Sequence, residues 1–414
     1  MIFALKERVS NKRSLPTAAE RSFRCIRTRL SVSIHELPTS PDISSEWRDL
    51  AGRAFVPNLF YEADFANAAA LPFGGGVRVI LARDAAGKLV LAWPFRLTRA
   101  RWGLPLASLV GWMHPFASLG VPLIDAAQAK EALVCLLSVH QSVPGLPPRA
   151  FLPQVPDEGP FAQLLDQVTD ELGLRTASLD RYERASWTQQ ANADAYATLS
   201  SGSRSKLRQE YRRLEREGTI VFETLTDRDD IERGLEDYLE LEAFGWKGRA
   251  GTAIPQSAEE TAFMRQVVRD YAGQGRVKID QLRIGSTTLA SSITYLSGTH
   301  AWYAKISFNE NFAKNSPGSQ LVLKVTEKWN AGTTILTADS CAPPGHPLMR
   351  RFWGSRFWLS NRVLELNGGD TLFPLVPRLE RLRTKMRELK DRARTARQKT
   401  MKNEKPSAPQ KEQA

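Results

Sequence analysis

The sequence predicts a mixed α/β (α+β) protein with two tandem domains of one fold, each a mixed, mostly antiparallel sheet flanked by helices. Turn residues separate short apolar runs that resemble strands from longer segments with helical spacing. The order of these segments in the first half (helix, antiparallel strands, helix, strand, helix, strand) recurs in the second half without visible sequence identity. A chain of 414 residues is long enough for two hydrophobic cores.

The first domain is expected over residues 31–190, after a basic, disordered tail at 1–30. Its expected elements are strands at 31–36, 77–83, 88–97, 150–154 and 175–181, and helices around Trp47 and Leu50, at 126–141 and at 161–172. Asp125 stands at the N-cap of the helix at 126–141. The uncharged run 105–124 is long enough to cross a bilayer, but its three prolines favour two buried strands joined by a turn.

The second domain is expected over residues 191–376. Its expected strands are 219–225, 277–284, 288–296, 300–306, 333–338 and 363–366, and its expected helices are 201–218, 229–244, 258–271, 317–330 and 348–357. A basic tail follows at 377–414. Apolar residues recur at helical spacing in its first part, at Leu379, Leu382, Met386 and Leu389. We therefore expect a helix resting on the body there, and disorder beyond Arg394.

The basic character of the chain belongs to its ends. The net charge is +12 and the pI is about 9.7. Removing 1–30 and 378–414 leaves 36 basic and 38 acidic residues, so the folded part is close to neutral. This distribution weakens a nucleic-acid-binding role for the whole protein, although the basic tails can contact an anionic surface.

The cysteines and histidines exclude other classes. Three cysteines far apart form neither a disulfide framework nor a metal site, and the five histidines are scattered. The N-terminal apolar segment is too short for a signal peptide. We therefore expect a cytoplasmic protein without a transmembrane segment and without a metal.

The helix expected at 201–218 is unusually basic for the interior of a chain. Leu207, Tyr211 and Leu214 form an apolar stripe, and Arg204 and Arg208 belong to a separate row with Arg212. The row is either a solvated surface or a contact for an anionic acceptor or cofactor.

The segment NSPGSQ, which leads into the helix at 317–330, favours anion binding. Ser316 suits the N-cap, Pro317 suits the first helical position, and Gly318 lets the backbone approach a ligand. The first helical turns lack the acidic residues that helix starts usually carry, so free N–H groups can bind a pyrophosphate. A capped helix that begins with proline is the plain alternative.

Several segments resemble the GNAT-like acyltransferase domain of bacterial CelD-type cellulose-biosynthesis proteins, which are related to the tandem-domain Fem aminoacyltransferases. They are SRSKLRQEYRRLEREG, LELEAFGWKGRAG, NSPGSQLVLKVTEKWNAG and the stretch from Asp339 to Trp353. The resemblance covers about residues 200–367 and implies two GNAT-like domains, the first without a cofactor loop. It also implies transfer of an acyl group from acyl-CoA, acetyl-CoA above all, to an amine or hydroxyl, often in polysaccharide biosynthesis. The implied pyrophosphate site is Ser316, Gly318, Ser319 and Gln320.

The chain departs from that family after Asp339. Such proteins usually show a Gly-rich turn followed by Tyr-Lys, whereas this chain has Arg350 and Arg351 there. The departure falls on the side of the site that would receive the acceptor.

Three residues are candidates for acid–base work on the acceptor: Asp339, Glu242 and Tyr303. Each also has an ordinary structural role, as a turn cap, a solvated helix residue and a core aromatic. Trp246 and Lys247 beside a glycine-containing loop suit a sugar or carboxylate acceptor. Cys341 lacks a histidine within its own motif, so we do not expect a covalent nucleophile there.

Three functions remain open on the sequence. The leading one is a CoA-dependent N- or O-acyltransferase that acts on a small or saccharide acceptor. The second is an aminoacyl-tRNA-dependent transferase, in which the basic helix and tails hold tRNA phosphates. The third is a non-catalytic scaffold that keeps the fold.

Overall fold

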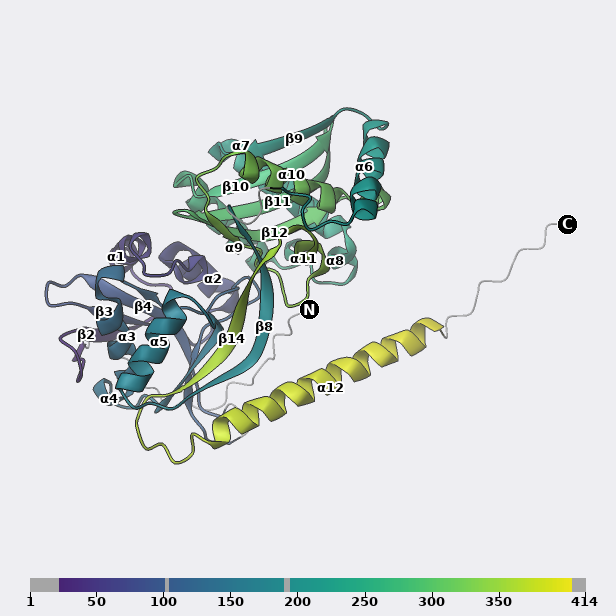
Figure 1. The fold of residues 1–414 in the computed structure, drawn as a ribbon. Helices are drawn as coiled ribbons and strands as arrows, with labels where there is room; N and C mark the ends of the chain where they lie inside the picture. Colours follow the sequence, from purple (N-terminus) through teal and green to yellow (C-terminus); the bar gives the residue numbers. More distant parts are fainter. Residues whose placement is uncertain (1–21, 101–103, 190–193, 404–414) are drawn as a thin grey trace.

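The computed structural model describes residues 22–100, 104–189 and 194–403 (Figure 1). In the first half, the helices are α1 (Pro41–Gly52), η1 (Leu59–Tyr61), α2 (Ala63–Phe73), η2 (Ala126–Gln128), α3 (Ala129–Leu137), α4 (Val139–Ser142) and α5 (Pro160–Glu171). The strands are β1 (Phe23–Arg24), β2 (Ser31–Glu36), β3 (Val77–Arg83), β4 (Leu89–Thr98), β5 (Ser108–Gly111), β6 (Leu123–Ile124), β7 (Arg149–Pro156) and β8 (Thr176–Thr188).

In the second half, the helices are α6 (Ser201–Glu215), α7 (Arg228–Phe244), α8 (Trp246–Arg249), η3 (Ile254–Gln256), α9 (Ala258–Gly273), η4 (Glu310–Asn315), α10 (Pro317–Ala331), α11 (Pro347–Phe352) and α12 (Leu375–Asn403). The strands are β9 (Ile220–Leu225), β10 (Val277–Ile284), β11 (Thr287–Ser297), β12 (His300–Phe308), β13 (Thr337–Asp339) and β14 (Ser355–Glu365).

The strands of both halves form one continuous sheet. Its order over the described residues is β1-β2-β3-β4-β5-β7-β14-β8-β13-β12-β11-β10-β9, with β6 attached to β4. Most pairs are antiparallel, and the parallel ones are β5 with β7 and β12 with β13. Figure 1 shows two lobes joined by the long strands β8 and β14. The fold class expected from the sequence, a mixed and mostly antiparallel sheet flanked by helices, is confirmed.

Helices cover both faces of the sheet in the second half. On one face, α7 and α9 pack with Ile279, Ile293 and Trp302 in a core that continues into the first half. On the other face, α6 and α10 pack with Leu282 and Tyr303 in a separate core. Leu207 and Leu214 of α6 are buried and Tyr211 is partly buried, so the apolar stripe expected on this helix is confirmed.

Several element boundaries differ from the sequence-based expectation. Residues 22–30 are packed, with Cys25 and Leu30 buried, whereas 1–21 lie outside the described residues. The helix expected at 126–141 is divided at Ser138, although Asp125 does accept a hydrogen bond from the Ala127 N–H at 2.9 Å. The run 105–124 holds β5 and β6, as expected.

The largest difference lies near the C-terminus. The helix expected at 348–357 ends at Phe352, and the strand expected to begin at 363 begins at Ser355. The reason is that β14 pairs along β8 from Ser355 to Leu364, and these cross-strand contacts override the local helical spacing. The strand expected at 333–338 is reduced to β13.

Candidate active site

A gap opens in the sheet where β12 and β13 separate. The two strands pair in parallel over only three positions, ending at Trp302 and Asp339. Strand β12 continues to Phe308 while pairing with β11 on its other edge. No other strand in the described part of the chain pairs with β12 beyond Trp302, so no strand ladder satisfies its backbone groups on that side.

A β-bulge at Ala304 determines which face Lys305 occupies. Tyr303 pairs with Thr294, whereas Lys305 pairs with Ile293, so Ala304 is the extra residue. In a regular strand without the bulge, Lys305 would share the α10 face with Tyr303, because residues two apart along a strand point to the same face. The bulge instead places Lys305 on the face covered by α7 and α9.

Lys305 lies where the two lobes meet. Its Nζ is 4.1 Å from the centroid of the Phe116 ring, which belongs to the first half. Burial, together with the neighbouring charge of Lys247, lowers the pKa of Lys305 to about 8, against the opposing effects of Glu242, Glu260 and Cys341. Within the described residues the ammonium group of Lys305 has no hydrogen bond or ion pair. This lysine therefore has a free amine in a substantial fraction of molecules near pH 8.

Glu242 stays ionised beside Lys305. It is buried and accepts hydrogen bonds from the Tyr238 hydroxyl (3.1 Å), the Ile254 N–H (2.9 Å) and the Lys247 ammonium. Burial acts to raise the pKa of Glu242, but the charges of Lys247 and Lys305 outweigh it and the pKa is lowered. The structure thus brings together two of the residues expected from the sequence, Glu242 and Lys247.

Asp339 forms a buried ion pair. Its Oδ2 is 3.0 Å from Nη1 of Arg184, and both side chains are almost fully buried. Its Oδ1 accepts the N–H of Cys341 at 2.7 Å. Arg184 also donates to the Ser118 carbonyl, Gln154 Oε1 and the Tyr182 hydroxyl. Both carboxylate oxygens are occupied, which favours a positioning role for Asp339 over proton transfer.

Tyr303 and Trp246 lie in different environments, one in the core and the other at the surface. Tyr303 is on the α10 face, where its ring packs against Trp329 and Trp353, and burial raises the pKa of its hydroxyl. The Trp246 side chain is 58% exposed at the start of α8, and the backbone N–H of Trp246 donates to Glu310 Oε1 at 2.6 Å. Trp246 is therefore available to a ligand at the surface, whereas Tyr303 is enclosed in the core.

The turn before α10 holds the residues that the sequence predicts to bind a pyrophosphate. Ser316 has φ 50° and ψ 49°, a left-handed conformation that is rare outside glycine. A Cβ on Gly318 would lie 3.5 Å from Phe308 Cδ1, an ordinary van der Waals distance, so the start of α10 packs on β12 without requiring a glycine at this position. Ser319 is partly exposed and no acidic residue lies in the first helical turn. Gln320 faces inward instead, donating to the Leu207 carbonyl at 2.9 Å.

The basic helix α6 packs beside η4, the segment that leads into this turn. Arg208 is exposed, with its guanidinium 5.9 Å from the Tyr196 ring, and Arg204 is partly buried, with its Nε donating to the Leu199 carbonyl. The Leu207 carbonyl of α6 accepts the hydrogen bond from Gln320, so the helix that carries Arg208 lies against the start of α10.

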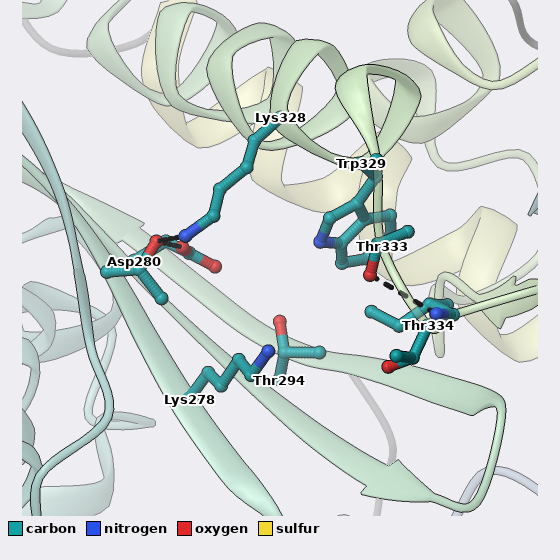
Figure 2. Close-up of a pocket in the computed structure, with 10 residues that line it drawn as sticks. Lys278, Asp280, Thr294, Lys328, Trp329, Thr333 and Thr334 are labelled. Carbon is teal, nitrogen blue, oxygen red and sulfur yellow. Dashed lines mark hydrogen bonds between the residues drawn. The ribbon is translucent and has the colours of Figure 1, made fainter.

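A separate pocket lies at the other end of α10. It has a volume of about 230 Å³ and is lined by Thr224, Lys278, Asp280, Thr294, Lys328, Trp329, Gly332, Thr333, Thr334 and Ile335. Figure 2 shows Lys328 and Trp329 projecting from the helix toward Asp280 and Thr294 of the strands. The Thr224 hydroxyl accepts from Lys328 and donates to buried Asp280, whose pKa is raised by burial. Lys328 is eleven residues beyond Pro317, about 16 Å along the helix axis, so this pocket is distinct from the gap at Lys305.

The described residues carry neither a metal-binding cluster nor a membrane-spanning helix. No group of three or more His, Cys, Asp or Glu side chains is arranged to hold a metal ion within them. Nor does any helix there combine the length and apolarity needed to cross a bilayer.

Residues 201–333 match a family model described as an acetyltransferase (GNAT) domain. This match defines a GNAT-type domain within the chain and covers less than half of its length. No curated protein matches the chain. Among solved structures, FemX is similar with a TM-score of 0.55 and 13% identity over 83% of this chain and all of the other.

Two further solved structures have lower scores. The C-terminal domain (DUF2156) of a putative lysylphosphatidylglycerol synthetase from Agrobacterium fabrum gives a TM-score of 0.49 and 14% identity over 81% of this chain and 95% of its own. A tandem GNAT protein from the clavulanic acid biosynthesis pathway gives a TM-score of 0.38 and 12% identity over 82% of this chain and all of its own. The family match and FemX support a GNAT-like fold.

Sequence reasoning missed Lys305, Arg184 and Phe116. Lys305 stands on a strand that the sequence located, but only the bulge brings it to the gap. Arg184 and Phe116 come from the first half, and their partners are 155 and 189 residues away in sequence. Local spacing carries no signal for contacts at such separations.

Proposed function

We propose that this protein is an acyl-CoA-dependent N- or O-acyltransferase whose site is the gap between β12 and β13. The observation that carries the proposal is the unpaired edge of β12, which runs from Lys305 toward the N-terminus of α10. The pantetheine of CoA is an extended chain with amide groups, so it can hydrogen-bond along such an edge. Its pyrophosphate would then reach Ser316, Gly318 and Ser319, where helix N–H groups are free.

This placement puts the thioester beside Lys305. The acceptor nitrogen or oxygen attacks the thioester carbonyl, the C–S bond breaks, and CoA leaves as a thiolate that is then protonated. We propose that the neutral amine of Lys305 takes the proton lost by the acceptor, because its pKa of about 8 suits a base near neutral pH. Glu242 would stabilise the resulting positive charge on Lys305. Asp339, held by Arg184, would position the Cys341 segment by accepting the Cys341 N–H. Tyr303 is left with a packing role in this scheme.

The acceptor would enter from the surface that carries Trp246 and Lys247. Arg350 and Arg351 lie on α11 beyond the Cys341 segment. Arg350 is paired with Glu183 at 2.7 Å, so Arg351 would be the one to favour an anionic acceptor. In line with the CelD-type resemblance, we propose an amine or hydroxyl on a saccharide or cell-envelope precursor, acetylated in the cytoplasm.

A second candidate is an aminoacyl-tRNA-dependent transferase. The similarity to FemX favours this reading, and Arg204, Arg208 and the basic helix α12 would then contact tRNA phosphates. A non-catalytic scaffold would bind neither donor.

Calorimetry with acetyl-CoA tests the proposed donor, and Ser319→Glu tests its site. A carboxylate in the first turn of α10 stabilises the helix but repels a pyrophosphate, so we expect at least about tenfold weaker binding with no loss of stability. Ser319→Gln is the neutral control of similar size and should bind nearly as the parent does. If acetyl-CoA does not bind the parent and tRNA does with a steep salt dependence, the second candidate replaces the first. Binding of neither would favour the scaffold.

A further inference from the structure

Among the α12 side chains that the structure describes, those of the first turns pack on the body. Val376 is buried with Phe373 in a small cluster on the sheet of the first half, which also contains Leu106, Phe151, Leu179 and Val363. Glu380 is also buried. Beyond these turns the helix extends away from both lobes (Figure 1). Leu382, Met386 and Leu389 lie there and are exposed rather than packed on the protein.

The exposed part of α12 carries an apolar stripe. Leu375, Leu382, Met386 and Leu389 are 43%, 55%, 50% and 62% exposed. Together with partly buried Leu379, they fall within about 80° of arc at 3.6 residues per turn. Four large exposed apolar side chains on one line of a helix are unusual for a surface that faces only water.

Charges are arranged around this stripe by sign. Residues 375–403 contain eleven Lys or Arg and only three Asp or Glu. Arg381, Lys385 and Lys390 are exposed on positions that flank the stripe. The three acidic residues, Glu380, Glu388 and Asp391, fall on the helix positions centred about 180° from the stripe. The helix positions therefore run from an apolar line, through cationic flanks, to an acidic side.

This arrangement of charges and apolar residues distinguishes between possible binding partners of α12. A second copy of α12 would place cationic flanks against cationic flanks, which opposes association. A nucleic acid would use the cations but gain nothing from exposed leucines. A bilayer with anionic phospholipids matches both features, because Leu and Met enter the acyl boundary while flanking Lys and Arg reach the phosphates.

We propose that α12 is a membrane-surface anchor that lies in the interface of an anionic phospholipid bilayer. The helix lies parallel to the surface with Leu382, Met386 and Leu389 inserted, and it holds the two lobes next to the membrane. This inference goes beyond the proposed acyltransferase activity and does not depend on it.

Vesicle flotation of the full chain tests the anchor. We expect binding to vesicles of phosphatidylcholine and phosphatidylglycerol at three to one, and at least about tenfold weaker binding to phosphatidylcholine alone. The triple variant Leu382→Gln, Met386→Gln, Leu389→Gln keeps every charge and should lose at least about tenfold in binding to the mixed vesicles. The triple variant Arg381→Gln, Lys385→Gln, Lys390→Gln should lose the preference for phosphatidylglycerol.

Leu71→Gln is the matched control, because Leu71 is 71% exposed on α2, away from the stripe. It should bind vesicles as the parent does, and all variants should unfold at the same temperature because none of these side chains is buried. Equal binding of the parent to both kinds of vesicle, or undiminished binding of the leucine variant, would overturn the proposal. A parent chain that dimerises without lipid, together with a monomeric leucine variant, would instead assign the stripe to a second copy of α12. Flotation of the parent only after RNA is added would assign the helix to nucleic-acid binding.

Discussion

Lys305 combines three properties that separate it from the other lysines around the gap. Its ammonium group has no hydrogen-bonding partner in the described chain and contacts the Phe116 ring. Its pKa is lowered to about 8. A depressed lysine pKa means that the neutral amine appears as pH rises through 8. If Lys305 is the base, kcat/KM should therefore increase with pH and level off above about pH 8.

The variant Lys305→Met should lower kcat/KM by about 10²- to 10⁴-fold and abolish this pH dependence. Lys328→Met, at the other end of α10, is the control and should keep both the rate and the profile. Steady-state thiol release from acetyl-CoA between pH 6 and pH 9.5 is the measurement. A Lys305→Met enzyme with an unchanged pH profile would assign the base to another residue.

Arg184 and Asp339 are expected to matter for stability because each is buried against the other. Arg184→Met leaves the Asp339 carboxylate buried without its counter-ion, which should cost about 3–5 kcal/mol of the free energy of unfolding. Urea unfolding measures this loss, and Arg181→Met, an exposed neighbour on β8, provides the control. A loss below about 1 kcal/mol would show that Asp339 is not held by Arg184 and would return it to the candidates for the base.

At the level of elements, strand β10 places Asp280 against the pocket beneath α10. Burial raises the pKa of this carboxyl, so the folded state favours its protonated form. The stability contributed by this group is complete below the ordinary Asp pKa and is lost as pH rises through the raised value. Asp280→Asn keeps an acceptor for the Thr224 hydroxyl but has no charge to bury.

We therefore expect Asp280→Asn to be more stable than the parent by about 1 kcal/mol at pH 7 and to show no advantage at pH 3. Thermal unfolding across this pH range is the measurement. An advantage that persists at pH 3 would point to packing instead of ionisation.

Helices and strands could be predicted where an apolar pattern repeats over many residues of the element. They were harder to predict where pairing with a distant strand determines the structure. The helices α6, α7, α9 and α10 and the strands β3 and β10 follow the expected ranges closely, because each carries its own apolar pattern. The sequence predicted too short a strand at β14, because the extended conformation of its first residues depends on pairing with β8. The candidate turn at Ser316 was found from capping residues, whereas Lys305 depends on a bulge that leaves no mark in the sequence.

At the scale of the whole molecule, Glu62 connects the two halves. It belongs to the first half and is buried, yet within the described residues its carboxylate accepts hydrogen bonds from groups of the second half: the Tyr271 hydroxyl (2.9 Å), Arg276 Nη2 (2.7 Å) and the Ser297 hydroxyl (3.0 Å). The hydrophobic core also continues across this boundary, since Phe60 packs on Trp302 and Phe65 on Phe263. The sheet itself is continuous through β8 and β14.

These connections predict that the two lobes unfold as one cooperative unit. Glu62→Ala leaves Arg276 and Tyr271 without their acceptor, so it should lower the free energy of unfolding by about 3–5 kcal/mol while keeping a single transition. Tryptophan fluorescence and far-UV circular dichroism should give the same midpoint in urea for the parent and the variant. Asp49→Ala, a surface position on α1, is the control and should change stability by less than about 0.5 kcal/mol. Two separated transitions in the parent would show that each half is stable alone, and the gap at Lys305 would then lie between lobes that can move independently.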